Sequence, residues 1–264
     1  MRAKRISQCT LTSILGLIAA AAAADQTFSD GTFNDADWTH VKLFDSSPIP
    51  RVLTASQSIS GGNPGTFQLL TQDRGNLGLG YAHLMAGAIY SPTVSGAIDR
   101  LSFSYDVQSF ITVPGGGGFA SFSPLLLQNG TYYTLSIDGS ITLEDHAQIG
   151  SWVHWVHPRL LPPDPPGLFA ADFIRSGAGP FHPDFSASGA PIQFGYFTDN
   201  LFIETGSGQF AAGIDNWSVI VTTQPVPEPS ILTLLFCGLV PCLIFGRQRW
   251  AASRLSRRRV SRSV

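Results

Sequence analysis

Apolar and polar residues alternate in short runs along most of the chain. The clearest run is 101–108, where Leu101, Phe103 and Tyr105 fall on one face of an extended segment and polar residues fall on the other. The run 215–221 repeats this pattern with Trp217, Val219 and Val221 on one face. A period of two residues is typical of half-buried β-strands, and no stretch of the central chain keeps the 3.6-residue period of an amphipathic helix.

Turn-forming residues stand where strands would have to reverse. Asn129-Gly130 predicts a two-residue hairpin turn between 125–128 and 131–135. Asp138-Gly139 predicts another, and the glycine-rich stretch 61–65 separates the runs on either side of it. About ten to thirteen short strands are expected, which favours an all-β, jelly-roll-like β-sandwich. The segments 60–65 and 213–219 resemble the ends of jelly-roll domains of the carbohydrate-binding-module and laminin-G (concanavalin-like) type.

The two ends of the chain have a different composition. Three basic residues precede an apolar run, 11–24, that ends in alanines, which predicts a signal peptide over 1–24 with cleavage before Asp25. At the other end, alternating prolines at 225–229 precede an uncharged run over 230–246. That run is at the short limit of the roughly 17–25 residues needed to cross a bilayer. Seven arginines follow without an acidic residue, so this tail is expected to remain cytoplasmic.

The order of these C-terminal elements resembles the PEP-CTERM sorting signal of Gram-negative bacteria, also classified as the C-terminal domain of ice-binding proteins. The resemblance is carried by Pro227-Glu228-Pro229, the apolar segment and the arginine cluster that begins with Arg247 and Arg249. It implies recognition by an exosortase and removal of the helix and tail. The expected organisation is a signal peptide (1–24), a β-sandwich ectodomain (25–222) and a sorting signal (223–264).

Charge is distributed unevenly between these parts. The whole chain has a net charge of −2, but only 6 of its 16 basic residues and 17 of its 18 acidic residues lie within 25–225, a surplus of 11 acids. Such a surface argues against nucleic acid as a partner. Cys9, Cys237 and Cys242 all lie outside this span, so disulfides are not expected to stabilise it.

The central span lacks the common catalytic motifs: it has no Gly-x-Ser-x-Gly, no His-Glu-x-x-His, no phosphate loop and no thiol. Its only glutamates, Glu144 and Glu204, are far apart in the sequence. Glycosidases need two neighbouring carboxylates. The sequence therefore favours a non-enzymatic protein, and a jelly-roll glycoside hydrolase or lyase is a weaker alternative.

Two groups of residues are candidate binding sites. In the segment 151–158, Trp152 and Trp155 fall on opposite faces of a strand, so one indole belongs to the core and the other could stack on a sugar ring. The alternative is a central strand with both indoles buried. The second group consists of polar residues near the first strand and one residue of the last strand: Asp30, Asn34, Asp35, Asp37 and Asp215. The first and last strands are neighbours in many jelly rolls, so these side chains could meet. These oxygens suit calcium, the alternative being local Asx turns and surface charge.

The resulting hypothesis is an exported protein of the cell envelope or extracellular matrix. It would pass through the inner membrane as an intermediate, with an exosortase as processing partner, and act in a structural or adhesive role. The alternative hypothesis is a carbohydrate-binding module that recognises exopolysaccharide. Calcium is the one cofactor that the sequence suggests.

Overall fold

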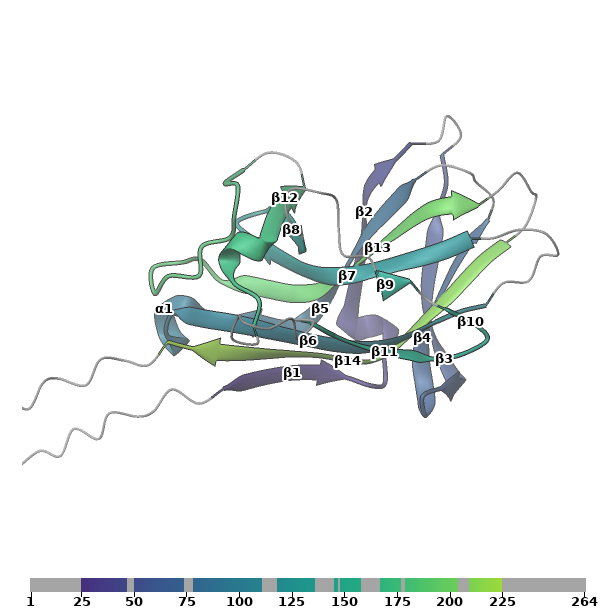
Figure 1. Ribbon diagram of the computed structural model, residues 1–264, viewed down its shortest axis with the longest axis horizontal. Helices are drawn as coiled ribbons and strands as arrows, with labels where there is room; N and C mark the ends of the chain where they lie inside the picture. Colours follow the sequence, from purple (N-terminus) through teal and green to yellow (C-terminus); the bar gives the residue numbers. More distant parts are fainter. Residues whose placement is uncertain are drawn as a thin grey trace, which may run out of the picture. The chain divides into compact units, whose positions relative to one another are not determined.

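The described residues form two stacked β-sheets, seen here in a computed structural model (Figure 1). The described residues all lie within the compact unit Ala23–Gln224. They comprise 25–46, 50–73, 78–110, 118–135, 145–146, 148–157, 167–176, 179–203 and 209–224. Among them no helix is both long and apolar enough to cross a membrane. The predicted signal peptide, the membrane segment 230–246 and the sorting motif lie outside the described residues.

Among the described residues each sheet has seven strands, and the chain passes between the sheets repeatedly. The first sheet, called sheet A, contains β1 (Gln26–Asp30), β3 (Leu53–Gly62), β4 (Gly65–Asp73), β6 (Ile98–Ser109), β10 (Gln148–Ile149), β11 (Val153–His157) and β14 (Gln209–Thr223). Sheet B contains β2 (Trp38–Asp45), β5 (Leu79–Tyr90), β7 (Gly118–Gln128), β8 (Thr131–Leu135), β9 (Asp145–His146), β12 (Phe173–Ser176) and β13 (Ile192–Ile203). The short helices are η1 (Asp35–Asp37), α1 (Pro92–Ser95) and η2 (Ala170–Asp172).

The described strand pairs are antiparallel except β10 with β6. In sheet A, β14 lies between β6 on one side and β4 with β1 on the other, so the first and last strands are neighbours as expected. In sheet B, β13 lies between β7 and β5. The all-β sandwich is therefore confirmed, with fourteen strands among the described residues and lengths of up to 15 residues.

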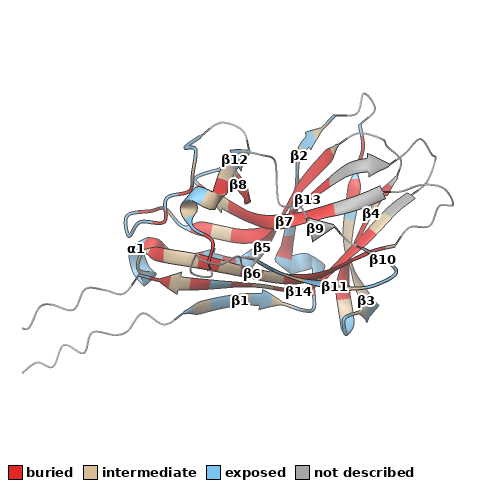
Figure 2. Cartoon of the chain, in the orientation of Figure 1, coloured by how far each residue is buried: buried red, intermediate tan, exposed pale blue. Residues whose placement is uncertain are grey.

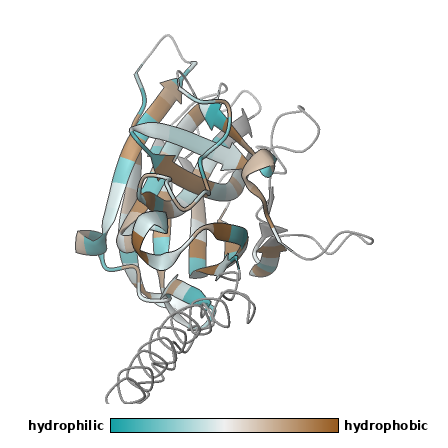
Figure 3. Cartoon of the chain, turned by 90° about the vertical axis from the view of Figure 1, so that its left-hand side faces the viewer, coloured by the Kyte–Doolittle hydropathy of each residue, from teal (hydrophilic) through white to brown (hydrophobic). Residues whose placement is uncertain are grey.

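The alternating pattern places its apolar side between the sheets. Leu101, Phe103, Tyr105 and Val107 are all fully buried, as is Trp217 on the neighbouring strand β14. Buried segments concentrate along β5, β6, β7, β13 and β14, whereas β1 alternates between intermediate and exposed residues (Figure 2). Apolar and hydrophilic segments can be followed along the strands in Figure 3. Because a buried aromatic or aliphatic side chain contributes roughly 1.5–3 kcal/mol, this core stabilises a span that has no cysteine.

The predicted turns form where they were expected among the described residues. Asn129 and Gly130 have φ of 50° and 75° and join β7 to β8. The glycine-rich stretch forms the turn between β3 and β4, with Gly61 and Gly65 at φ of 97° and 95°. Positive φ is costly for most residues but not for glycine. Asp138-Gly139 lies outside the described residues.

A second apolar cluster lies on the outer face of sheet B. Ala82, Leu84, Leu125 and Phe197 form it, and all four are buried. The central strands of sheet B are therefore apolar on both faces. This explains why β7, where Leu125 and Leu126 are both fully buried, shows no clean alternation in the sequence.

Candidate functional site

Two carboxylates lie opposite each other on the outer face of sheet A. Asp106 on β6 pairs in register with Asp215 on β14, and these residues are only 3% and 0% exposed. Burial raises the pKa of the Asp215 carboxyl, and the charges of Asp106 and Asp30 raise it further, against two backbone hydrogen bonds that lower it. The sequence does not indicate that these two carboxylates form a pair, because 108 residues lie between them.

Hydrogen bonds hold the turn between β3 and β4 against this pair of carboxylates. Asn63 donates its backbone N–H to Asp215 Oδ2 (2.5 Å) and its side-chain amide to Asp106 Oδ2 (3.1 Å). Asn216, in a bulge of β14 at φ 50°, donates its side-chain amide to the same Asp106 oxygen (2.7 Å) and to the carbonyl of Asn63. The turn thus lies across sheet A. A Cβ on Gly62 would come within 2.7 Å of Asp215 Oδ2, so the close approach requires glycine.

Trp152 lies beside this turn, immediately before β11. Its indole Nε1 donates to the carbonyl of Gly61 (3.1 Å). Its ring centroid is 5.4 Å from that of Phe67 and 6.2 Å from that of Phe110, both edge-on. A Cβ on Gly213 would come within 2.8 Å of Trp152 and Phe67, so both rings lie over the outer side of β14. The indole is held in place but remains partly exposed.

His154 completes the surface. Its side chain is 57% exposed, and its Nδ1 lies 2.5 Å from Asp106 Oδ1, a carboxylate that is only 5% exposed. The buried carboxylate fixes the ring, which leaves Nε2 as the atom that is not engaged by Asp106. We call the partly exposed Trp152 and the exposed residues Asn63, His154 and Asn216 the Trp152 patch.

The chemistry of the Trp152 patch is that of a binding surface. It offers an indole, an imidazole and two carboxamides. Each carboxylate oxygen beneath it is within hydrogen-bonding distance of a group of the chain: His154, the two asparagine side chains, or a backbone N–H of Asn63 or Asn216. Buried carboxylates engaged in this way position the residues above them and are not exposed to a substrate.

The other predicted stacking residue has a different environment. Trp155 lies opposite Tyr105 on β6 and packs against the core between the sheets. The segment 151–158 therefore has one inward and one outward indole, which is the first of the two sequence interpretations. Trp155 is not placed to stack on an external sugar.

Four of the five residues predicted to bind calcium, namely Asp30, Asn34, Asp35 and Asp215, accept hydrogen bonds from the chain. Asp30 accepts from Thr32, from the backbone of Phe33 and from the indole of Trp38 (2.7 Å). Burial would raise the pKa of Asp30, but these hydrogen bonds outweigh it and lower the pKa. Asn34 caps η1 through the N–H of Ala36.

Asp35 has a separate role, because its carboxylate accepts the N–H of Gln57 on the edge strand β3 (2.6 Å). Asp37 lies in η1, and Asp215 belongs to the pair described above. Within the described ranges no group of three or more His, Cys, Asp or Glu side chains is placed to hold a metal ion. Asp30 and Asn34 thus form Asx-type hydrogen bonds and Asp35 binds the edge strand β3, while calcium binding by these residues stays a prediction.

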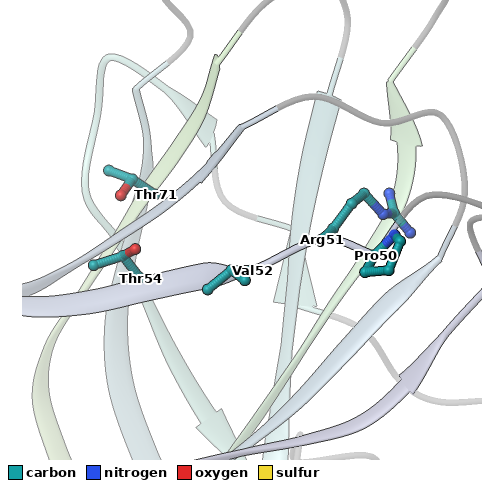
Figure 4. Close-up of a pocket in the computed structure, with 5 residues that line it drawn as sticks. All are labelled: Pro50, Arg51, Val52, Thr54 and Thr71. Carbon is teal, nitrogen blue, oxygen red and sulfur yellow. The ribbon is translucent and has the colours of Figure 1, made fainter.

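A pocket of about 270 Å³ lies elsewhere, at the start of β3 (Figure 4). Pro50, Arg51, Val52, Thr54 and Thr71 line it. The Arg51 guanidinium is bound to Asp45 Oδ1 and to the carbonyl of Gly78, and its Nη1 is buried without a hydrogen-bond partner. Because Nη1 is inaccessible to water, it is not presented to the pocket, and the pocket offers a ligand little beyond two threonine hydroxyls.

No family model matches the sequence, and no curated protein matches it. Among solved structures, the chain is similar to the family 11 carbohydrate-binding module of the cellulosomal cellulase Lic26A-Cel5E of Clostridium thermocellum. The two sequences are 13% identical, the match covers 77% of this chain and 98% of that chain, and the TM-score is 0.38. The CBM22-1 xylan-binding domain from Paenibacillus barcinonensis Xyn10C gives 10% identity, coverages of 78% and 97%, and a TM-score of 0.35. TM-scores this low leave the function to be argued from the residues of the chain itself.

Proposed function

We propose that this chain is an exported, non-enzymatic jelly-roll β-sandwich that adheres to polysaccharide through the outer face of sheet A. The observation that carries the proposal is the Trp152 patch, in which a partly exposed indole shares the outer face of sheet A with an imidazole and two carboxamides. Sugar rings present C–H groups that pack on an aromatic face and hydroxyls that bond to imidazole and amide groups. Adhesion to exopolysaccharide would give the structural role expected from the sequence a molecular basis.

Preorganisation supports this assignment. Trp152 is held by Gly61, Phe67 and Phe110, and His154 is held by a buried carboxylate. Because the protein's side chains are already ordered before the ligand arrives, the entropic cost of binding is lower.

Delivery to the cell surface is the second part of the proposal and rests on the sequence. Export through the signal peptide (1–24) and processing at Pro227-Glu228-Pro229 by an exosortase would place the sandwich in the cell envelope or the extracellular matrix. The membrane segment 230–246 would hold the protein in the inner membrane until processing.

Substitution of Trp152 tests the binding proposal. A pull-down panel first identifies the polysaccharide that binds the wild type. For that polysaccharide, full-length protein carrying Trp152→Ala should lose at least about tenfold in affinity, equivalent to roughly 1.4 kcal/mol. Trp152→Phe should keep part of the affinity, because a smaller aromatic face remains. The panel consists of insoluble cellulose, agarose, xylan, β-mannan and the exopolysaccharide of the source cells.

Phe181→Ala is the matched control, because Phe181 is an aromatic residue that is 60% exposed outside the Trp152 patch. Melting temperatures of all variants are measured to separate folding from binding. Equal retention of wild type and Trp152→Ala, with both folded, would refute the site.

A further inference from the structure

The outer face of sheet A continues beyond the Trp152 patch as an uncharged surface across four strands. The strand register brings Val156 opposite Ser104, Ser104 opposite Ser218, and Ser218 opposite Ser29. A parallel row is formed by Ser102, Ile220 and Thr27. We call these two rows the serine face: Thr27, Ser29, Ser102, Ser104, Val156, Ser218 and Ile220.

These side chains point away from the core. Their chain neighbours Phe103 and Val219 are fully buried between the sheets. Thr27 and Ser29 are exposed, and Val156 and Ile220 are 45% and 38% exposed. His154 lies two residues before Val156 on β11, so the serine face and the Trp152 patch adjoin.

The absence of charge from these seven positions is informative. Charged side chains lie mostly at protein surfaces, so the outward-facing positions of a sheet are where Lys, Glu, Asp and Arg are expected. Here every position is a small hydroxyl or an aliphatic side chain. Covering a hydroxyl that finds a new hydrogen-bond partner costs far less than covering a charge. The serine face can therefore be covered by a large neutral ligand at low cost in desolvation.

We propose that the serine face extends the Trp152 patch and selects an uncharged, hydroxyl-rich polysaccharide that lies across the strands. This inference rests on the proposed function. Neighbouring strands are about 4.8 Å apart, so Ser29, Ser218 and Ser104 present hydroxyls to a polymer chain at regular intervals. An acidic polysaccharide is disfavoured, because 25–225 carries a surplus of 11 acidic residues.

The test compares ligand length and charge in full-length protein. Titration calorimetry uses oligosaccharides of increasing length from the neutral polysaccharide that the wild type retains, with oligogalacturonate as the acidic comparison. Affinity for the neutral series should rise with length in the wild type. In the double variant Ser104→Gln with Ser218→Gln, which adds bulk without charge, the rise should stop early and affinity for the longest ligand should fall at least tenfold.

Thr39→Gln is the matched control, because Thr39 is an exposed hydroxyl position on β2 of the other sheet. If Trp152→Ala abolishes binding but the double serine variant binds the longest ligand like the wild type, the proposed function stands and the serine face is excluded. Stronger binding of oligogalacturonate than of the neutral series would overturn the selection for an uncharged ligand. Absence of binding to all ligands would refute the proposed function itself.

Discussion

His83 is a buried, titratable residue through which the stability of the fold depends on pH. It is fully buried on the inner side of sheet B, with Nδ1 2.7 Å from Nδ1 of His40 and Nε2 2.9 Å from the Thr198 hydroxyl. Its ring stacks on Tyr196 at 4.4 Å, and Tyr81 lies nearby. Burial, and then the neighbouring His40, hold the pKa of His83 well below its ordinary value of 6.5. The folded protein therefore keeps this imidazole neutral.

Acid should destabilise the fold through this residue. Below about pH 6.5 the unfolded chain protonates His83 and the folded chain does not, so the free energy of unfolding falls as pH falls, by up to about 1.4 kcal/mol per pH unit. His83→Gln should flatten the dependence of unfolding free energy on pH between 6.5 and 5. Urea denaturation at several pH values measures it. His182→Gln is the control, and an unchanged slope in His83→Gln would contradict the assignment.

At the scale of elements, close packing between strands depends on positions without a side chain. Gly195 on β13 faces β5 where the pairing shifts between Gln193 and Gly195. A Cβ at Gly195 would come within 1.9 Å of the carbonyl oxygen of His83 and within 3.0 Å of Leu84 Cα. These are backbone atoms, so the neighbour cannot move away as a flexible side chain would.

Gly195→Ala should therefore destabilise the sandwich by about 1–3 kcal/mol, the cost of overpacking. The measurement is the free energy of unfolding from chemical denaturation. Gly87→Ala is the matched control on β5, because a Cβ there meets nothing within 4 Å. Equal stabilities of the two variants would show that β5 and β13 adjust more easily than their packing indicates.

At the scale of the whole molecule, the basic residues are concentrated at the ends of the chain and the acidic residues in the sandwich. Within 25–225 there are 17 acidic and 6 basic residues, whereas seven arginines follow residue 246. This distribution is the basis of the proposal that the ends direct export and that the central domain acts outside the membrane. The sorting signal stays a prediction, because its residues lie outside the described part of the chain.

Replacement of Pro227, Glu228 and Pro229 by alanine tests the sorting signal. In the source cells the variant should accumulate in the inner membrane at the size of the unprocessed chain, because the exosortase would lack its recognition motif. Cell fractionation with immunoblotting detects this. A chain with Pro162 and Pro163 changed to alanine serves as the control. Wild-type surface delivery of the triple variant would contradict the sorting assignment.

Local pattern predicted much of the fold. Alternation identified the inward faces of β6 and β14, and Asn129-Gly130 identified a hairpin turn, because side-chain direction and turn geometry depend on a few neighbouring residues. Alternation failed in β7, where both faces of sheet B are buried. It also could not indicate β9 and β10, which have two residues each.

The sequence by itself determined the class of fold, the faces of the clearest strands and the surplus of acid in the central span. It left open whether both indoles of 151–158 are buried, and the structure decided that Trp155 packs on the core while Trp152 lies on the outer face. Only the tertiary structure placed Asp106 opposite Asp215, fastened Asn63 across sheet A and set His154 above a buried carboxylate. These contacts join residues 48 to 152 positions apart. Their formation depends on which strands pair and in which register, and that is decided by packing of the two sheets and not by local sequence.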